Sequence, residues 1–266
     1  MRLDKKQQDL IDHNYVVAMG LLISNSIIGE FFNNYKMSIF NSGAPSNQFN
    51  IAFVKETTTK PEKHIQTWEQ FFASRGLHFR VSFRPGLEKD FESLLVQKGY
   101  KENRPEPVMT LSHLSVKTVY HKDLEIKPVS DLNELSHFQE IIEKSYSLPE
   151  GSGPYVITER IMNLPDVKLL VGYADHQPAC TSMLVKTGPV AGIYWVATLE
   201  KFRNHGFGKS ITQQSLVAGE ERGCEFACLQ ASAMGKPVYE SLGFDTPYHY
   251  RNYASPEHKI LTGYTG

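Results

Sequence analysis

The segment from Val190 to Arg222 constrains the fold more than any other part of the chain. It predicts an apolar strand at 190–198, a turn that contains Gly206 and Gly208, and a helix that ends near Arg222. At the start of such a helix the backbone N–H groups have no intrahelical acceptor and carry the positive end of the helix dipole. Glycines let that backbone approach a ligand closely. The segment therefore predicts an anion site suited to a phosphate or pyrophosphate.

Two common nucleotide motifs do not match this turn. A Walker loop needs a glycine at position 203, where the chain has Arg203, although Gly208, Lys209 and Ser210 supply the tail of that motif. The dinucleotide fingerprint needs a third glycine three residues after Gly208, where the chain has Ile211. Both interpretations are set aside.

The second half of the chain, from about residue 123, predicts a mixed sheet. Consecutive strands joined by short turns should pair antiparallel, whereas the two strands on either side of the Gly206 helix should be parallel. The fold class is therefore α+β with a mixed sheet, and not a doubly wound sheet. The predicted strands are 126–131, 167–174, 178–187, 190–198, 225–231 and 247–253, and the predicted helices are 131–147, 156–164, 210–222 and 236–242.

The first half predicts a similar order of elements. Helices end in glycine plus an aromatic residue at 89–100 (KDFESLLVQKGY) and at 236–244 (KPVYESLGF), so an ancient duplication is a hypothesis. The place of the glycine turn is taken by KETTTKPEKH (55–64), which has no glycine. We therefore predict one cofactor site per chain, in the second half. The predicted helices are 4–24, 60–76 and 85–100, and the predicted strands are 35–40, 49–54, 77–83 and 107–114.

Two stretches of the second half together resemble the Gcn5-related N-acetyltransferase family. VATLEKFRNHGFG (196–208) resembles the acetyl-CoA motif of that family, Arg/Gln-x-x-Gly-x-Gly/Ala after a strand. LQASAMGKPVYESLGF (229–244) resembles its second motif, with a tyrosine five residues before the final Phe. The resemblance covers roughly residues 123–255. It implies an acyl-CoA N-acyltransferase fold, with a complete domain at 119–266 and a partial, degenerate copy at 1–118.

The resemblance also implies where acetyl-CoA binds. Backbone groups of Val196, Ala197 and Thr198 would bind the pantetheine arm and the acetyl carbonyl, because the parallel strands separate there. Arg203 marks the motif, and the backbone N–H groups after it would hold the pyrophosphate. Ser232 stands where the family usually has Asn. The residues of the pyrophosphate turn are Arg203, Asn204, His205, Gly206, Phe207, Gly208 and Lys209.

Tyr239 is the predicted catalytic residue, implied by the second motif. It would donate a proton to the departing CoA thiolate, since a phenol with a pKa of about 10 suits a thiolate of about 8.5. Backbone N–H donors would polarise the thioester carbonyl. Without the motif, Tyr239 is an aromatic residue on a helix face that packs on the sheet.

The acceptor side is less marked in the sequence. The loop SLPEGSGPY (147–155) contains Glu150 and Tyr155, candidates to contact an amine, although an ordinary exposed loop is the alternative. Tyr194 and Trp195 are adjacent in the motif strand, so strict alternation puts one on the acceptor side and the other in the core. Trp195 is therefore a third candidate for contact with the acceptor substrate.

Composition narrows the partners and the compartment. Lys and Arg number 28 and Asp and Glu 29, so no basic excess favours nucleic acid. The apolar run 16–29 is shorter than the roughly 20 residues of a membrane span, which favours a buried helix. Cys180, Cys224 and Cys228 lack the spacing of a metal site, so no metal is expected, and their scarcity fits a reducing, cytoplasmic compartment.

These observations predict an acetyl-CoA-dependent N-acetyltransferase that acts on a primary amine of a small molecule or a protein. The alternative is a non-catalytic acyl-CoA sensor or interaction module that has kept the fold. The first half would wall off one side of the acceptor cleft or form the contacts of a homodimer.

Overall fold

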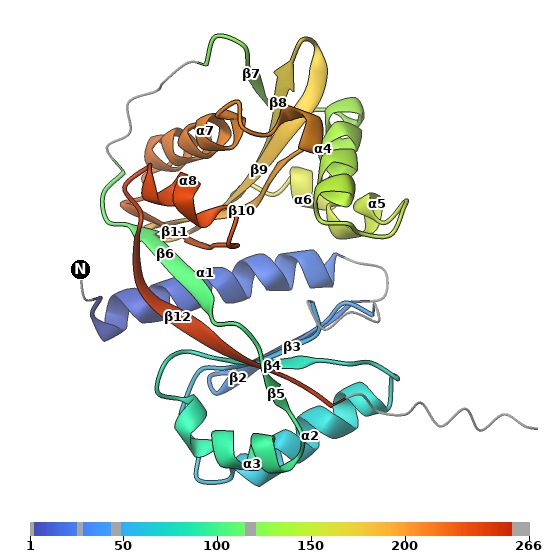
Figure 1. Cartoon of the computed structure of the whole chain (residues 1–266), viewed down its shortest axis with the longest axis vertical. Coiled ribbons are helices and arrows are strands. Elements are labelled where there is room, and N and C mark those ends of the chain that lie inside the picture. The colour runs from blue at the N-terminus through green and yellow to red at the C-terminus, as the bar shows by residue number, and fades with distance from the viewer. Residues whose placement is uncertain (1–2, 26–28, 44–48, 115–120, 257–266) are drawn as a thin grey trace, which may run out of the picture. The chain divides into compact units, whose positions relative to one another are not determined.

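The computed structural model describes residues 3–25, 29–43, 49–114 and 121–256 (Figure 1). Its contacts divide the chain into two compact units, neither of which is continuous in sequence. The chain passes from one unit to the other three times. Unit 1 is Met1–Ile27 with Pro107–Tyr248, and unit 2 is Ile28–Glu106 with His249–Gly266.

The sheet of unit 1 has the predicted mixed topology. Its described strands are β6 (Glu106–Leu111), β7 (Glu125–Pro128), β8 (Val167–Ala174), β9 (Gln177–Thr187), β10 (Val190–Thr198) and β11 (Phe226–Gln230). They lie in the order β6-β11-β10-β9-β8-β7. β10 and β11 are parallel and the other pairs are antiparallel, as the connections predicted.

Helices cover both faces of this sheet. Those of unit 1 are α1 (Lys5–Ser24), α4 (Leu132–Ser145), α5 (Gly153–Val156), α6 (Glu159–Met162), α7 (Phe207–Glu221) and α8 (Lys236–Glu240). α7 contacts one face, where the Ser215 hydroxyl donates to that of Ser182 in β9. α4 lies on the opposite face (Figure 1). There the His137 ring contacts that of Tyr173 in β8. α1 packs on this second face, against β9 and β10.

α1 is held by a capping box and by burial of its apolar surface. The Asp4 carboxylate accepts from the Gln7 amide at 2.7 Å, and the Gln7 side chain accepts in return from the Asp4 amide at 3.2 Å. The apolar run of the helix is buried within unit 1 as far as Ile23, in agreement with the predicted buried helix. Residues 26–28 of that run lie outside the described residues. Within the described part of the chain, no helix is long and apolar enough to cross a membrane.

Unit 2 has its own sheet with a strongly aromatic core. Trp68, Phe72, Phe79, Phe83 and Phe91 are all buried in one cluster. The strands lie in the order β1-β2-β3-β4-β12, with β5 on β12, and β3 and β4 are parallel. The elements are β1 (Glu30–Asn33), β2 (Met37–Asn41), β3 (Ile51–Val54), α2 (Pro61–Ala73), β4 (Arg80–Phe83), α3 (Glu92–Gln97), β5 (Lys101–Glu102) and β12 (Asp245–Ala254).

Several boundaries differ from those expected. The division between 118 and 119 lies outside the described residues, and the compact units group residues differently because α1 packs with the second half and the end of β12 with the first. The helix predicted over 85–100 is reduced to a short 3-10 turn and α3, since Gly86 adopts a left-handed φ of 95°. α5 begins inside the loop predicted at 147–155.

Candidate active site

The parallel strands β10 and β11 separate in the middle of the unit 1 sheet. They pair at three positions, the last of which is Gly192 with Cys228. Beyond it β11 stays paired with β6 as far as Gln230, and β10 continues along β9 as far as Thr198. Residues 193–198 of β10 therefore have no partner in β11. We call this stretch the unpaired edge of β10, and it includes the predicted pantetheine contacts Val196, Ala197 and Thr198.

A β-bulge bends β10 within this edge. The pairing with β9 shifts between Tyr194 and Ala197, and Trp195 has a left-handed φ of 51°. The Trp195 carbonyl accepts from the Thr181 hydroxyl at 2.9 Å, which holds the bulge in place. Tyr194 reaches Asn14 of α1, and the Trp195 ring contacts that of Tyr146, the residue after α4. The extra residue of a bulge interrupts the strict alternation of a strand, so alternation does not decide which side either residue faces. The assignment of one to the acceptor side and the other to the core stays a prediction.

Asn14 of α1 lies at the point where the two strands part. Its side-chain amide donates to the Val185 carbonyl at 3.0 Å and to the Thr187 hydroxyl at 2.8 Å. Its side-chain oxygen accepts from the Tyr194 hydroxyl at 2.6 Å. A Cβ at Gly192 would lie 1.8 Å from that oxygen, so this position admits glycine alone. Asn14 therefore fixes β9 and β10 where the support of β11 ends.

The predicted pyrophosphate turn follows the unpaired edge directly. Asn204 and Gly206 have left-handed φ angles of 66° and 81°, and α7 begins at Phe207. Arg203 ties the turn to the strand, since its Nε donates to the Thr198 carbonyl at 3.3 Å. The amides of Phe207, Gly208 and Lys209 lie in the first turn of α7 and have no acceptor within the helix. Amides at such a turn form a concave site for anions.

The turn has the open backbone that a pyrophosphate requires. A Cβ at Gly208 would come no closer than 3.5 Å, to the Thr198 hydroxyl, and one at Gly206 no closer than 3.8 Å, to His121 Nε2. No described atom therefore comes closer to either glycine than ordinary van der Waals contact, and the first turn of α7 holds no acidic residue. The residues present fit a diphosphate group.

The side chains of Phe207, His205 and Lys209 contact other groups of the protein. Phe207 is buried with Ile211 and Leu170 in a small apolar cluster. His205 is exposed and its ring stacks on Phe207 with centroids 5.6 Å apart, while its Nδ1 lies 2.8 Å from the Arg203 carbonyl. Lys209 Nζ donates to the Ser241 carbonyl at 3.3 Å. Backbone groups are thus left to face a ligand.

Tyr239 of α8 is buried in the core between the sheet, α7 and α8. Burial raises its pKa, and the nearby Tyr146 raises it further. A Cβ at Gly235 would lie 2.9 Å from the Tyr239 ring, so the ring needs a glycine beside it. The Ser232 hydroxyl accepts from the Gly235 amide at 3.0 Å and holds the turn before α8. Tyr239 is therefore both a packed aromatic residue and a protonated phenol at neutral pH.

Tyr146 is a site residue that the sequence did not reveal. It directly follows α4, and its hydroxyl donates to the Val196 carbonyl at 3.1 Å. Its ring packs edge to face on Trp195 with centroids 5.0 Å apart. Tyr146 is 37% exposed as a residue, yet burial of its hydroxyl raises its pKa to about 12. Tyr146 follows an amphipathic helix and belongs to no motif, so no local pattern marks it. Its contact with the Val196 carbonyl depends on the bulge in β10.

The acceptor candidates on the loop after α4 are solvent-exposed. Tyr155 is 54% exposed, Glu150 is exposed as well, and neither side chain makes a hydrogen bond within the described residues. The loop is held instead by Glu143, whose carboxylate accepts from the amides of Gly151 and Gly153. The structure brings Trp195 and Tyr146 together, but it does not join Glu150 or Tyr155 to them by any described contact.

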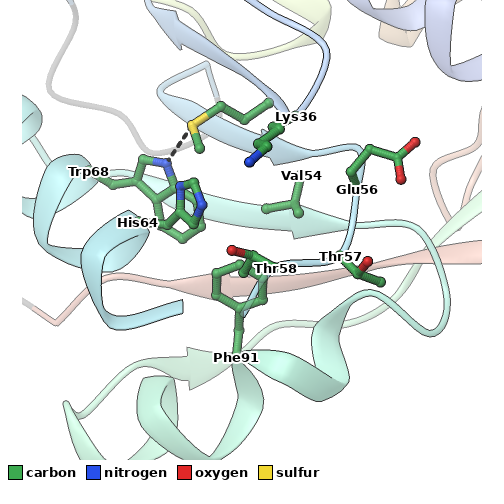
Figure 2. A pocket seen from close by; sticks show the side chains of 9 residues that line it. Lys36, Val54, Glu56, Thr57, Thr58, His64, Trp68 and Phe91 are labelled. Carbon is green, nitrogen blue, oxygen red and sulfur yellow. Dashed lines mark hydrogen bonds between the residues drawn. The ribbon is translucent and has the colours of Figure 1, made fainter. Parts of the chain in front are cut away.

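A separate hollow lies in unit 2, between the end of β3 and the start of α2. Figure 2 shows Lys36, Thr58 and the rings of His64, Trp68 and Phe91 around it. Its volume of about 10 Å³, room for about one water molecule, is far below that of typical ligand sites, about 300–1,000 Å³. The three rings pack together, and burial, with smaller effects of Lys36 and Lys63, lowers the pKa of His64. This hollow is not the predicted cofactor site.

The cysteines do not form a reactive or metal-binding group in the structure. All three are free and buried, and burial raises the pKa of Cys180 to about 12. This matches their interpretation as small apolar residues. Within the described part of the chain, no three His, Cys, Asp or Glu residues gather in a way that could hold a metal ion.

Comparison with known proteins rests on structure, since no family model and no curated protein sequence matches the chain. A GCN5-related N-acetyltransferase from Kribbella flavida has a TM-score of 0.70 at 15% identity, over 92% of this chain and 96% of that one. One from Sphaerobacter thermophilus has a TM-score of 0.63 at 14% identity, over 87% and 78%. A tandem GNAT protein from the clavulanic acid biosynthesis pathway has a TM-score of 0.58 at 10% identity, over 84% and 78%. Over most of its length, the chain therefore has the fold of Gcn5-related N-acetyltransferases.

Proposed function

We propose that the chain is an acetyl-CoA-dependent N-acetyltransferase that transfers an acetyl group directly to a primary amine of a small molecule or protein. The observation that supports this most is the unpaired edge of β10, which leads straight into the glycine turn at α7. Beyond Gly192 the edge has no β11 residue paired with it, which leaves a place for an extended amide-bearing chain, and the first turn of α7 offers its amides to a diphosphate. Coenzyme A contains both, joined in that order.

Unit 1 supplies the groups that the transfer needs. Amides of the 204–209 turn bind the diphosphate, and backbone groups of Val196, Ala197 and Thr198 align the thioester and polarise its carbonyl. The amine nitrogen forms a bond to the carbonyl carbon, the carbon–sulfur bond breaks, and the amine proton passes to solvent. No covalent bond to the protein forms, so no nucleophilic side chain is needed.

Tyr239 assists the departure of the thiolate in this proposal. Because its pKa is raised, the phenol stays protonated throughout the neutral range and can donate a hydrogen bond, and then a proton, to the sulfur; Tyr239 then regains a proton from solvent. Tyr239 does not act as a base. Its burial beside Gly235 fixes the direction of its hydroxyl without a flexible chain.

The test is release of free thiol from acetyl-CoA over a panel of primary amines, with Tyr239→Phe beside the wild type. We expect turnover by the wild type and a kcat about 100-fold lower in Tyr239→Phe, the usual size of a lost general acid. The Kd for acetyl-CoA, measured by calorimetry, should stay within twofold because the ring is kept. Tyr35→Phe, at a residue 76% exposed in unit 2, is the matched control and should be unchanged.

Two results would contradict the proposal in different ways. Binding of acetyl-CoA without turnover on any amine would favour the alternative function of an acyl-CoA sensor. Unchanged turnover in Tyr239→Phe would keep the enzyme but remove this residue from its mechanism.

A further inference from the structure

Tyr146 and Tyr239 approach the same strand from opposite faces of the sheet. Tyr146 follows α4, on the face where Trp195 contacts it. Tyr239 lies in the core cluster on the α7 face, with Leu216 and Leu229. In a continuous sheet the backbone would separate the two rings. Here Tyr146 acts on Tyr239 from the other face, since it adds to the effect of burial in raising the pKa of Tyr239. The two side chains can be neighbours because β10 and β11 are not paired between them.

The Val196 carbonyl explains why Tyr146 is held at this place. Val196 belongs to the bulge and has no partner in the ladder between β9 and β10. Its carbonyl is therefore available, and the Tyr146 hydroxyl donates to it at 3.1 Å. The edge-to-face contact with Trp195 fixes the ring from the other side. A ring with two such contacts has a defined position beside the unpaired edge.

We propose that Tyr146 is a specificity-determining residue for the acyl donor: its ring covers the α4 side of the unpaired edge and limits the donor to a short acyl chain. This inference rests on the proposed function, which places the thioester along the same edge. Tyr239 would then contact the sulfur from the α7 side, while Tyr146 and Trp195 stand where a longer acyl chain would extend. The ring, and not the hydroxyl, is the part that excludes it.

The experiment is calorimetric titration of the full chain with acetyl-CoA, butyryl-CoA and octanoyl-CoA, which needs no knowledge of the amine. The wild type should bind acetyl-CoA at least tenfold more tightly than octanoyl-CoA. Tyr146→Ala should shift that ratio at least tenfold toward octanoyl-CoA, because removal of the ring opens room for apolar methylenes. Tyr146→Phe keeps the ring and should stay within threefold of the wild-type ratio.

Controls distinguish failure of the role of Tyr146 from failure of the proposed function on which it rests. Tyr146→Val is a second truncation for the case that the alanine variant does not fold, and Tyr35→Ala tests removal of an exposed tyrosine ring elsewhere. A wild type that binds no acyl-CoA would overturn the proposed function itself. A wild type that binds octanoyl-CoA as well as acetyl-CoA, an unshifted ratio in the truncated variants, or a shift in Tyr146→Phe as large as in Tyr146→Ala would overturn the role of Tyr146 alone.

Discussion

Both units contain a strand, a loop, a helix and a second strand parallel to the first, yet only one of the two arrangements has an open edge. In unit 1, β10 and β11 pair at three positions and then separate. In unit 2, β3 and β4 pair at all four positions, from Ile51 with Arg80 to Val54 with Phe83. A paired strand has no free backbone groups on that side, so β3 and β4 have no open edge between them.

The starts of the two helices differ at the same position. The second residue of α7 is Gly208, whereas the second residue of α2 is Glu62, after Pro61. A carboxylate in the first turn neutralises the positive end of a helix dipole and repels an anion. Three packed rings, those of His64, Trp68 and Phe91, lie beside the start of α2. An anion site thus depends on a few residues and does not come with the strand–helix–strand order itself.

The helices that follow, α8 and α3, differ at the position of Tyr239. Both end in a left-handed glycine, Gly243 or Gly99, and in both the next amide donates to the carbonyl five residues earlier: Phe244 to Tyr239 and Tyr100 to Leu95. Leu95 therefore stands in unit 2 where unit 1 has Tyr239. The packing role is common to both units, and the phenol is confined to unit 1. This likeness agrees with the hypothesis of a duplication, which superposition of the two units would test.

The largest expected effect comes from giving unit 1 the acidic helix start of unit 2. Gly208→Asp should weaken acetyl-CoA binding at least about 100-fold, or about 2.7 kcal/mol, because a carboxylate would face the diphosphate. The unfolding temperature of the free protein should not fall, since a side chain meets no close contact there and an acid suits a helix start. Gly208→Ala is the matched control and should bind within a few-fold of the wild type. Equal affinities of the aspartate variant and the wild type would place the diphosphate elsewhere.

A second change tests what supports the open edge. Asn14→Ala should lower the free energy of unfolding by about 2 kcal/mol, because one buried and two part-buried hydrogen bonds are lost and their partners are left without the Asn14 side chain. Chemical denaturation measures it, and His13→Ala on the exposed side of the same helix is the control. A variant as stable as the wild type would mean that β10 needs no support where β11 leaves it.

The pH dependence tests the difference between Tyr239 and Leu95. The pKa of Tyr239 is raised, so its phenol stays protonated above the usual value near 10, and kcat/KM should not fall between pH 7 and 10. It should rise with pH instead as the amine acceptor loses its proton. Tyr239→Phe should give a lower rate with the same profile. A decline near pH 10 in the wild type that is absent from Tyr239→Phe would contradict this.

The smallest expected effect comes from giving unit 2 the glycine that unit 1 has at its helix start. Glu62→Gly removes the acidic residue of α2 but leaves β3 and β4 paired, so calorimetry should still find one acetyl-CoA per chain. A second equivalent of acetyl-CoA bound by this variant would show that the helix start alone decides whether a unit binds acetyl-CoA, and that the pairing of β3 with β4 does not matter.

Local sequence patterns predicted most of the elements of unit 1. The strands at 167–174 and 190–198 match β8 and β10 to the residue, and α4, capped by Asp131, lies within the helix predicted at 131–147. Alternation and turn residues act over short distances, so one sequence suffices to read them. The glycine turn was found in the same way, from Gly206 and Gly208 after an apolar strand.

The features that sequence could not supply depend on residues far apart in the chain. The bulge at Trp195 is fixed by Thr181 on the neighbouring strand, and Tyr146 reaches the site only because that bulge frees the Val196 carbonyl. The grouping of α1 with unit 1 depends on Asn14 and its partners, which no local pattern indicates. Each of these contacts joins residues far apart in the sequence, so it produces no periodic pattern of residue types.

The position of Asn14 has a consequence for how the chain is made. α1 is synthesised early, while Val185, Thr187 and Tyr194 follow 171, 173 and 180 residues later. At roughly 5–20 residues per second, α1 waits on the order of 10–35 seconds for them. An isolated helix of this length is marginal in water, and its apolar side has no cover in that interval. α1 therefore completes its contacts with the sheet of unit 1 only after β10 has left the ribosome.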